Sequence, residues 1–158
     1  MGITVLSPEE IQEIRSELEH SPTSQAACIE ALKIVQRHQG WVSDESISDL
    51  SLHLKMSPEE IDAVATFYNL IFRRKVGRHI ILVCDSISCW VMGYENVRQK
   101  ILSILGITMG QTTEDGKFTL LPIVCLGVCE HAPAMMIDGD VHWELTPEKI
   151  ENLLEKYK

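Results

Sequence analysis

The chain has 158 residues, 45% of them hydrophobic, and a formal net charge of −9 at pH 7. A chain of this length buries roughly two-thirds of the surface of its unfolded form, so it can fold without disulfides. The negative charge opposes the phosphates of nucleic acid, and the sequence contains neither a G-x-G-x-x-G nor a G-K-S/T loop for a nucleotide phosphate. We therefore expect neither nucleic-acid binding nor NAD binding by this chain alone.

The cellular compartment is predicted from the cysteines and the N-terminus. The number of cysteines is odd, five in all, and the segment from Met1 to Ser7 lacks the basic start and long apolar stretch of a signal peptide. No run approaches the roughly 20 apolar residues that span a bilayer. We expect a reducing compartment, the cytoplasm, and membrane attachment only through partners.

The first half of the sequence predicts a small helical bundle. Two segments, Ser7-Pro8-Glu9-Glu10 and Ser57-Pro58-Glu59-Glu60, carry the serine, proline and glutamate of a capping box. Between them a second helix stops near Gly40, and a short third segment follows. The apolar positions that recur at helical spacing are Ile11, Ile14, Leu18, Cys28, Ala31, Leu32, Val35, Ile47, Leu50, Leu54, Ile61, Val64, Ala65 and Tyr68.

A change of period near Val76 predicts a domain boundary. A basic group, made up of Arg73, Arg74, Lys75 and Arg78, surrounds this position and is interpreted as a solvated linker or as a docking patch. Beyond it the pattern becomes extended. We predict two domains, residues 1–75 as a helical docking bundle and residues 76–158 as an α/β domain.

The second domain is expected to alternate between strands and helices. A strand over residues 79–83 precedes a loop with Cys84 and Cys89, a helix around Val97 to Leu105, and a strand over residues 118–124. The pair Asp138-Gly139 predicts a hairpin turn before a last helix. This order describes a small α/β layer with both cysteine loops at strand ends, where open sheets commonly bind ligands.

Four of the five cysteines form two close pairs, Cys84-x4-Cys89 and Cys125-x3-Cys129. Each pair follows an apolar run that is typical of a strand, so two adjacent strand ends would bring four thiolates to one sheet edge. Each iron of a 2Fe-2S cluster needs two sulfur ligands from the protein, and each pair can serve one iron. We predict a 2Fe-2S cluster bound by Cys84, Cys89, Cys125 and Cys129, with no catalytic residue on the chain.

Other interpretations of the cysteines fit the spacing less well. The tight C-x2-C-x2-C run of many 4Fe-4S proteins is absent, and so is the plant-type C-x4-C-x2-C spacing. Zinc is the main rival, because one of the two loops falls within the range of structural zinc knuckles. A Rieske centre needs two histidines, and only His131 lies near a cysteine pair.

Residues around the cysteines are given structural roles. Cys28 is expected in the core of its helix. His131 is interpreted as a solvated loop residue that could tune the cluster indirectly. Gly93 and Gly127 allow close backbone approach, and apolar cover for the cluster is expected from Ile87, Trp90, Val91, Leu126 and Val128.

Over its full length the sequence resembles the family of thioredoxin-like 2Fe-2S proteins found in NADH:quinone oxidoreductase, the respiratory complex I, where this component is the E subunit, or NuoE. The resemblance rests on Glu30 to Gln36, on Val64-Ala65-Thr66-Phe67-Tyr68, on Cys84-Asp85-Ser86 with Cys89, on Leu121-Pro122 before Cys125-Leu126-Gly127 and Cys129, and on Ala132-Pro133-Ala134-Met135-Met136. It implies a thioredoxin-like fold for residues 76–158 and the same four cysteine ligands. Because such folds often carry a cis proline before their third strand, we also expect a cis Ala132-Pro133 bond.

The resemblance also implies a place in an enzyme complex. The partner would be the flavoprotein NuoF, the F subunit, which binds NADH, FMN and a 4Fe-4S cluster. Through it the chain would join the G subunit and the rest of a proton-translocating NADH dehydrogenase. The 2Fe-2S cluster would then exchange single electrons with the FMN, and the complex would lie on the cytoplasmic face of the inner membrane.

Four alternatives remain open at the level of sequence. The same module resembles the small diaphorase subunit of NAD-reducing hydrogenases and of NAD-dependent formate dehydrogenases. A free ferredoxin or a zinc-stapled interaction module is also possible, although a simple electron carrier would not need the helical half. Copurifying subunits would discriminate among the enzyme complexes.

Overall fold

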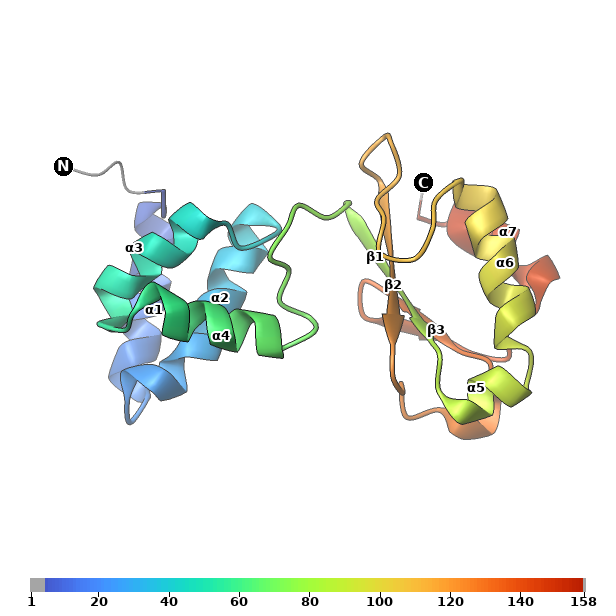
Figure 1. Ribbon diagram of the computed structural model, residues 1–158, viewed down its shortest axis with the longest axis horizontal. Helices are drawn as coiled ribbons and strands as arrows, with labels where there is room; N and C mark the ends of the chain where they lie inside the picture. Colours follow the sequence, from blue (N-terminus) through green and yellow to red (C-terminus); the bar gives the residue numbers. More distant parts are fainter. Residues whose placement is uncertain (1–4, 158) are drawn as a thin grey trace. The chain divides into compact units, whose positions relative to one another are not determined.

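The computed structural model describes residues 5–157, so part of the N-terminal segment considered above lies outside it. The chain forms two compact units that divide between Lys75 and Val76, and each has its own hydrophobic core. Figure 1 shows the helices of the first unit and the mixed strands and helices of the second. Within residues 5–157, no helix is both long enough and apolar enough to cross a membrane.

The first unit consists of α1 (Pro8–His20), α2 (Ser24–Gln39), α3 (Asp44–Leu54) and α4 (Pro58–Phe67). Both predicted capping boxes are confirmed, because Ser7 and Ser57 each exchange two hydrogen bonds with the glutamate three residues later. Gly40 ends α2 with a φ of 83°, a left-handed conformation that suits glycine. Local sequence signals therefore fix the starts of α1 and α4 and the end of α2.

The predicted place of Tyr68 on the apolar stripe of the fourth helix is wrong. Helix α4 ends at Phe67, and Tyr68 turns into an extended conformation with 47% of its surface exposed. The amide of Ile71 donates to the carbonyl of Tyr68, and this turn brings the Ile71 side chain into the core instead. A residue beyond the helix thus contributes a buried side chain to this core, while Tyr68 does not.

The basic group at the boundary does not act as one surface. Arg73 folds back onto the first unit, where Nε donates to Asp62 at 2.7 Å and Nη2 donates to Asp44 at 2.6 Å. Its Nη1 also donates to the carbonyl of Val42. Arg73 is therefore a structural residue, while Arg74, Lys75 and Arg78 are exposed.

The second unit is a four-stranded sheet in the order β2-β1-β3-β4. Strand β2 runs parallel to β1, and the pairs β1-β3 and β3-β4 are antiparallel. Asp138 and Gly139 have positive φ angles of 52° and 101°, so the predicted hairpin turn is confirmed. The elements are β1 (His79–Cys84), α5 (Ile87–Val91), α6 (Tyr94–Leu105), β2 (Phe118–Ile123), the 3-10 turn η1 (Cys129–His131), β3 (Met135–Ile137), β4 (Asp140–His142) and α7 (Pro147–Glu155).

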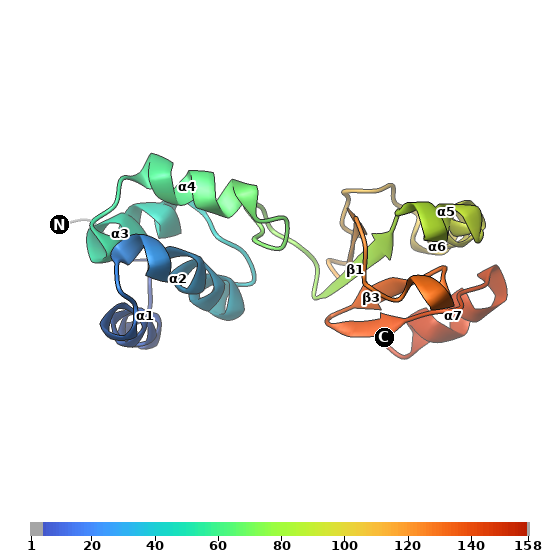
Figure 2. The same ribbon diagram turned by 90° about the horizontal axis from the view of Figure 1, so that it is seen from below.

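Helices α6 and α7 pack on the same face of the sheet (Figure 2). The side chains of this face alternate along the strands with a period of two, as a half-covered sheet requires. At the ends of β1 and β2 the second unit holds α5, η1 and the loop after β2, and all four paired cysteines lie there (Figure 1). The core of this unit contains Ile81, Val83, Val97, Ile101, Phe118, Leu120, Met135, Ile137, Leu145, Ile150, Leu153 and Leu154.

Candidate metal centre

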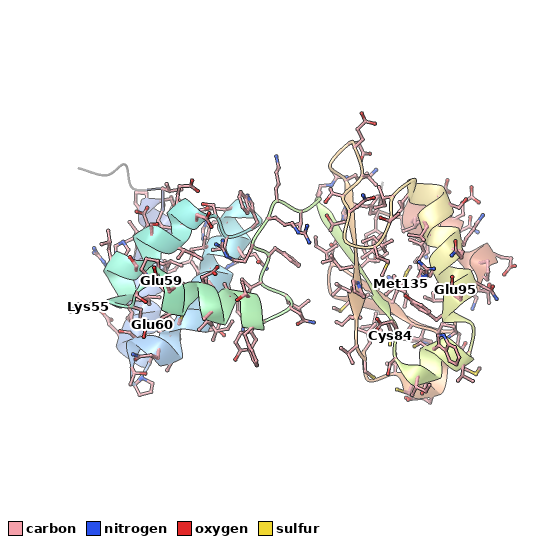
Figure 3. The ribbon with its side chains drawn as sticks, viewed as in Figure 1. Lys55, Glu59, Glu60, Cys84, Glu95 and Met135 are labelled. Atoms are coloured by element: carbon pink, nitrogen blue, oxygen red, sulfur yellow. The ribbon has the colours of Figure 1, made fainter. Side chains whose placement is uncertain are left out.

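The first cysteine pair is buried. Cys84 is the last residue of β1, and Cys89 lies in α5; each is about 2% exposed. Figure 3 shows Cys84 at the end of β1 beside α5. The sequence predicted a loop here, and the structure has a five-residue helix between Ser86 and Met92 instead. This short helix brings the Cys89 side chain back toward Cys84.

The second cysteine pair is exposed and follows the neighbouring parallel strand. Cys84 pairs in register with Ile123, the last residue of β2, so the loop with Cys125 begins beside Cys84. Cys125 and Cys129 have their sulfur atoms 3.5 Å apart. The sulfur of Cys84 contacts the carbonyl of Val124 at 3.3 Å. Parallel pairing of β1 with β2 therefore brings both cysteine pairs to one sheet edge, as the sequence predicts.

Gly127 shapes the exposed loop. Its φ of 78° lies in the left-handed region, which side chains other than glycine rarely adopt. In this conformation its amide donates to the sulfur of Cys125 at 3.4 Å. A backbone donor aimed at sulfur stabilises negative charge on that sulfur, which a thiolate ligand carries.

The thiols influence one another across the two pairs. Burial raises the pKa of Cys89 to about 11, and its hydrogen bond with Cys84 adds to this effect. The amide of Gly127 and then the thiol of Cys129 lower the pKa of Cys125, and Cys84 contributes in the same direction. The hydrogen bond to Cys125 raises the pKa of Cys129, and the negative charge of the Cys125 sulfur raises it further. A hydrogen bond with the Ser88 hydroxyl lowers the pKa of Cys129. All four thiols thus belong to one electrostatic cluster.

The apolar cover of the site differs from the prediction. Leu126 and Val128 pack against the buried cysteines, with Ala132 and Ala134. Ile87, Trp90 and Val91 instead face outward, with exposed fractions of 64% to 70%. Helix α5 is short and lies at the edge of the unit, so it has one inward side, which Cys89 occupies. The residues beside Cys89 therefore form a surface around the site.

The donor set suits a cluster held by two sulfur pairs. Two sulfurs that bind one tetrahedral metal at about 2.3 Å lie about 3.8 Å apart, close to the spacing of Cys125 and Cys129. Among residues 5–157, no three His, Cys, Asp or Glu side chains are gathered around the position of a single metal ion. The Cys125–Cys129 spacing fits two ligands of one iron, and with Cys84 and Cys89 as a second pair the four cysteines fit a two-iron cluster.

Residues outside the cysteine set have other places. Cys28 is fully buried in the core of the first unit, which confirms its predicted structural role. His131 is exposed, and its Nδ1 lies 3.1 Å from the carboxylate of Glu144. Ser88 and Glu144 were not singled out from the sequence, because a serine within C-x4-C and a glutamate 15 residues after Cys129 carry no local signal.

Comparison with known proteins identifies the family of the chain. The family described as thioredoxin-like 2Fe-2S ferredoxin matches residues 14–158. The chain belongs to this family. It therefore has the fold of a thioredoxin-like 2Fe-2S ferredoxin, and its cofactor is a 2Fe-2S cluster. The Ala132-Pro133 bond is cis, as the resemblance predicts.

Relatives of this ferredoxin-like chain are E subunits of NADH-quinone oxidoreductase. The E subunit of NADH-quinone oxidoreductase from Pseudomonas aeruginosa is 50% identical over 153 residues, which cover 97% of this chain and 92% of that protein. The protein of the same name from Escherichia coli K12 is 49% identical over the same shares. This chain is thus similar over nearly its whole length to E subunits of that enzyme.

A solved structure shares the same fold. A chain of an NAD+-reducing NiFe hydrogenase in the air-oxidized state is 25% identical, with a TM-score of 0.68 over 85% of this chain. The match covers only 22% of that hydrogenase chain, so it does not assign the activity of the whole hydrogenase to this chain.

Proposed function

We propose that this chain is the electron-transfer E subunit of an NADH-quinone oxidoreductase and that Cys84, Cys89, Cys125 and Cys129 are the ligands of its 2Fe-2S cluster. The observation that carries the proposal is the gathering of both cysteine pairs at one sheet edge in a chain half identical to such E subunits. A bound 2Fe-2S cluster supplies the acceptance and donation of single electrons. The chain itself contributes no hydride-transfer site to this proposal.

The two cysteine pairs have different surroundings, which gives the site an inner and an outer side. Cys84 and Cys89 are buried against Ala132 and Ala134, so this pair fixes the site to the sheet. Cys125 and Cys129 are exposed at the surface. Electrons exchanged with another protein would enter and leave on the side of the exposed pair.

The surface around the exposed pair is suited to a protein partner. Four apolar side chains in or next to α5 are more than 60% exposed, and so is Val124 beside Cys125. A hollow of about 380 Å³ lies at this surface, and it is lined by Ile87, Ser88, Val91, Met92 and Cys129. Contiguous exposed apolar surface commonly marks a protein interface. This surface, called the α5 surface, consists of Ile87, Trp90, Val91, Met92 and Val124.

The partner at the α5 surface is the flavoprotein NuoF, which carries NADH, FMN and a 4Fe-4S cluster, and through it the chain reaches the G subunit and the remaining complex. A one-electron centre next to the two-electron carrier FMN would exchange single electrons with it. The first unit, the helical domain of residues 1–75, serves as a second docking element. The assembly lies on the cytoplasmic face of the membrane.

A second candidate is that the chain is the diaphorase subunit of an NAD-reducing hydrogenase. The similarity of its fold to a chain of such an enzyme favours this candidate. An equivalent subunit of an NAD-dependent formate dehydrogenase is the third. Affinity purification of the full chain from its native host distinguishes them. Quinone-reductase membrane subunits support the proposal, whereas a nickel-iron or molybdenum subunit in their place contradicts it.

The ligand set is tested by substitution in the anaerobically purified full chain. Alanine at Cys84, Cys89, Cys125 or Cys129 is expected to abolish or strongly reduce the two irons and two sulfides per chain and the EPR signal after dithionite reduction. Cys28→Ala is the matched control, because that thiol is buried in the other unit. Wild-type iron, sulfide and EPR in any one of the four variants would remove that residue from the ligand set.

A further inference from the structure

Glu144 has an unusual backbone conformation close to the metal centre. It follows β4 in the chain and has a φ of 50°, in the left-handed region. Only two other residues besides glycine, Lys55 and Asp138, adopt such a φ within residues 5–157. Asp138 belongs to a hairpin turn that requires it, whereas Glu144 lies in the connection to α7. Such conformations persist where surrounding contacts over-determine them.

Three contacts hold Glu144 in place. Its amide donates to the carbonyl of His131 at 2.7 Å, and its carboxylate lies 3.1 Å from Nδ1 of the same histidine. Its own carbonyl accepts a hydrogen bond from Nζ of Lys149 at 2.7 Å. Glu144 thus binds η1 with both its backbone and its side chain while Lys149 ties it to α7. These three residues are called the Glu144 clamp.

The clamp acts on the segment that carries Cys129. That cysteine is the first residue of η1, and His131 is the last. The amide of His131 donates to the carbonyl of Val128 at 3.0 Å, and this bond closes the turn around Cys129. Next to the clamp, the amide of Leu145 donates to the carbonyl of Pro133 at 3.1 Å. The segment after Cys129 is therefore attached to the β4-α7 connection by bonds on both sides of Ala132.

Cys129 needs an outside support because burial does not fix it. Cys84 and Cys89 are held by the core, while Cys129 is exposed. The Trp143 ring also packs near His131, with the ring centres 6.0 Å apart. An exposed ion pair by itself contributes little to stability. The Glu144 carboxylate is therefore expected to orient η1 and to contribute little to the stability of the fold.

We propose that Glu144 is a positioning residue of the metal centre, which fixes the Cys129 ligand by clamping both the backbone and the imidazole of His131. The inference rests on the proposed ligand role of Cys129. It makes the connection after β4 part of the cluster site, although none of its residues binds iron. Partners that orient metal ligands from outside the ligand set commonly change metal affinity when they are removed.

The test uses the full chain with its cluster and three substitutions. Glu144→Gly removes the carboxylate and retains the left-handed backbone, whereas Glu144→Gln retains an oxygen that can accept from Nδ1. Glu130→Gln is the control for charge, because Glu130 adjoins Cys129 in η1 but is not part of the clamp. The readouts are the rate of cluster loss to a chelator, the EPR spectrum of the reduced protein and its midpoint potential.

The expected result is that Glu144→Gly loses its cluster about tenfold faster than wild type and shows a changed EPR spectrum. Glu144→Gln is expected to keep the wild-type rate and spectrum, and Glu130→Gln to change the potential alone. Wild-type behaviour of Glu144→Gly in all three readouts overturns the proposal. So does an equal defect in Glu144→Gln and Glu144→Gly, because orientation by the hydrogen bond would then not be the cause.

Two further variants keep the test decisive. If Glu144→Gly does not fold, His131→Ala breaks the side-chain contact from the other end, and the same faster loss is expected from it. A wild-type rate in His131→Ala would overturn the proposal. Cys129→Ala separates this inference from the ligand assignment: a normal cluster in that variant refutes the ligand role, whereas a lost cluster with normal Glu144 variants refutes the clamp alone.

Discussion

The amide of Gly127 donates a hydrogen bond to the sulfur of Cys125 across 3.4 Å. This contact depends on the left-handed conformation of Gly127, at a φ of 78°. A donor directed at a ligand sulfur stabilises the more negative, reduced form of a cluster. With Cys125 as a proposed ligand, the glycine is expected to affect both the shape of the loop and the reduction potential of the cofactor.

Gly127→Ala is expected to lower the midpoint potential of the cluster. Loss of about 1 kcal/mol, a typical net hydrogen-bond contribution, corresponds to about 40 mV for a one-electron couple. Redox titration followed by EPR measures this shift. Gly93→Ala is the control, since Gly93 also has a positive φ, of 107°, but it is the N-cap of α6 and has no hydrogen bond to a sulfur among those found in residues 5–157. Equal shifts in the two variants would argue against the amide of Gly127 as the cause.

Arg73→Ala is expected to destabilise the first unit by about 2 kcal/mol, because hydrogen bonds to charged groups are worth about 1.5 to 3 kcal/mol. The substitution leaves Asp62, Asp44 and the carbonyl of Val42 without their shared partner. Arg74→Ala makes the same change in charge at an exposed position and should have little effect. Urea unfolding of both variants provides the comparison, and equal stability would contradict the structural role of Arg73.

The structure shows which features were accessible from the sequence. The capping boxes at Ser7 and Ser57 were predictable because all their partners lie within three residues. The meeting of the cysteine pairs followed from placing each pair after a strand. Both signals are short-range, and the parallel pairing of β1 with β2 adds the one long-range step.

Other features depend on contacts that local patterns do not record. Arg73 meets Asp44 and Val42 from about 30 positions away, so its sequence neighbours suggested only a basic linker. Helix α5 has five residues, too few for a helical period to be recognised. The outward direction of Trp90 follows from the position of that helix at the edge of the unit, whereas hydrophobicity alone suggested burial. Tertiary context decided these cases.

Gly77→Ala is expected to destabilise the second unit by about 1 to 3 kcal/mol, the usual cost of forcing extra volume into a packed site. A Cβ atom at Gly77 would lie 2.8 Å from the carbonyl carbon of Phe118, which is backbone and cannot rotate away. The Gly77 amide also donates to Thr119 Oγ1 at 2.6 Å. Faster hydrogen exchange in β1 and β2 would report the effect, and unchanged exchange there would refute it.

Trp90→Ala is expected to weaken binding to the proposed flavoprotein partner by about 30-fold, since interface aromatic residues often contribute about 2 kcal/mol. Trp90 is 64% exposed, so its removal should leave the cluster and the fold intact. Ile104→Ala, an exposed apolar position near the other end of α6, is the control. Copurification and surface plasmon resonance measure the effect. An unchanged affinity in Trp90→Ala would place the interface away from the α5 surface.

His142 is expected to make the stability of the second unit depend on pH. Burial lowers the pKa of His142, Asp140 opposes this effect, and Lys156 adds to it. Its Nε2 lies 2.9 Å from the hydroxyl of Tyr157, which donates to Asp140 at 3.2 Å. A histidine with a lowered folded pKa takes up its proton first in the unfolded chain, so stability should fall as pH drops below about 6.5. The decline should end below the folded pKa.

His142→Gln isolates this contribution, because glutamine does not titrate and can still meet Tyr157. The difference in unfolding free energy between wild type and variant should change in favour of the variant as pH falls from about 7.5 to 5.5, across the ordinary histidine range. Denaturant unfolding at several pH values measures it. A difference that stays constant over this range would show that His142 has the same pKa in the folded and unfolded chains, and the pH dependence would then belong to other groups.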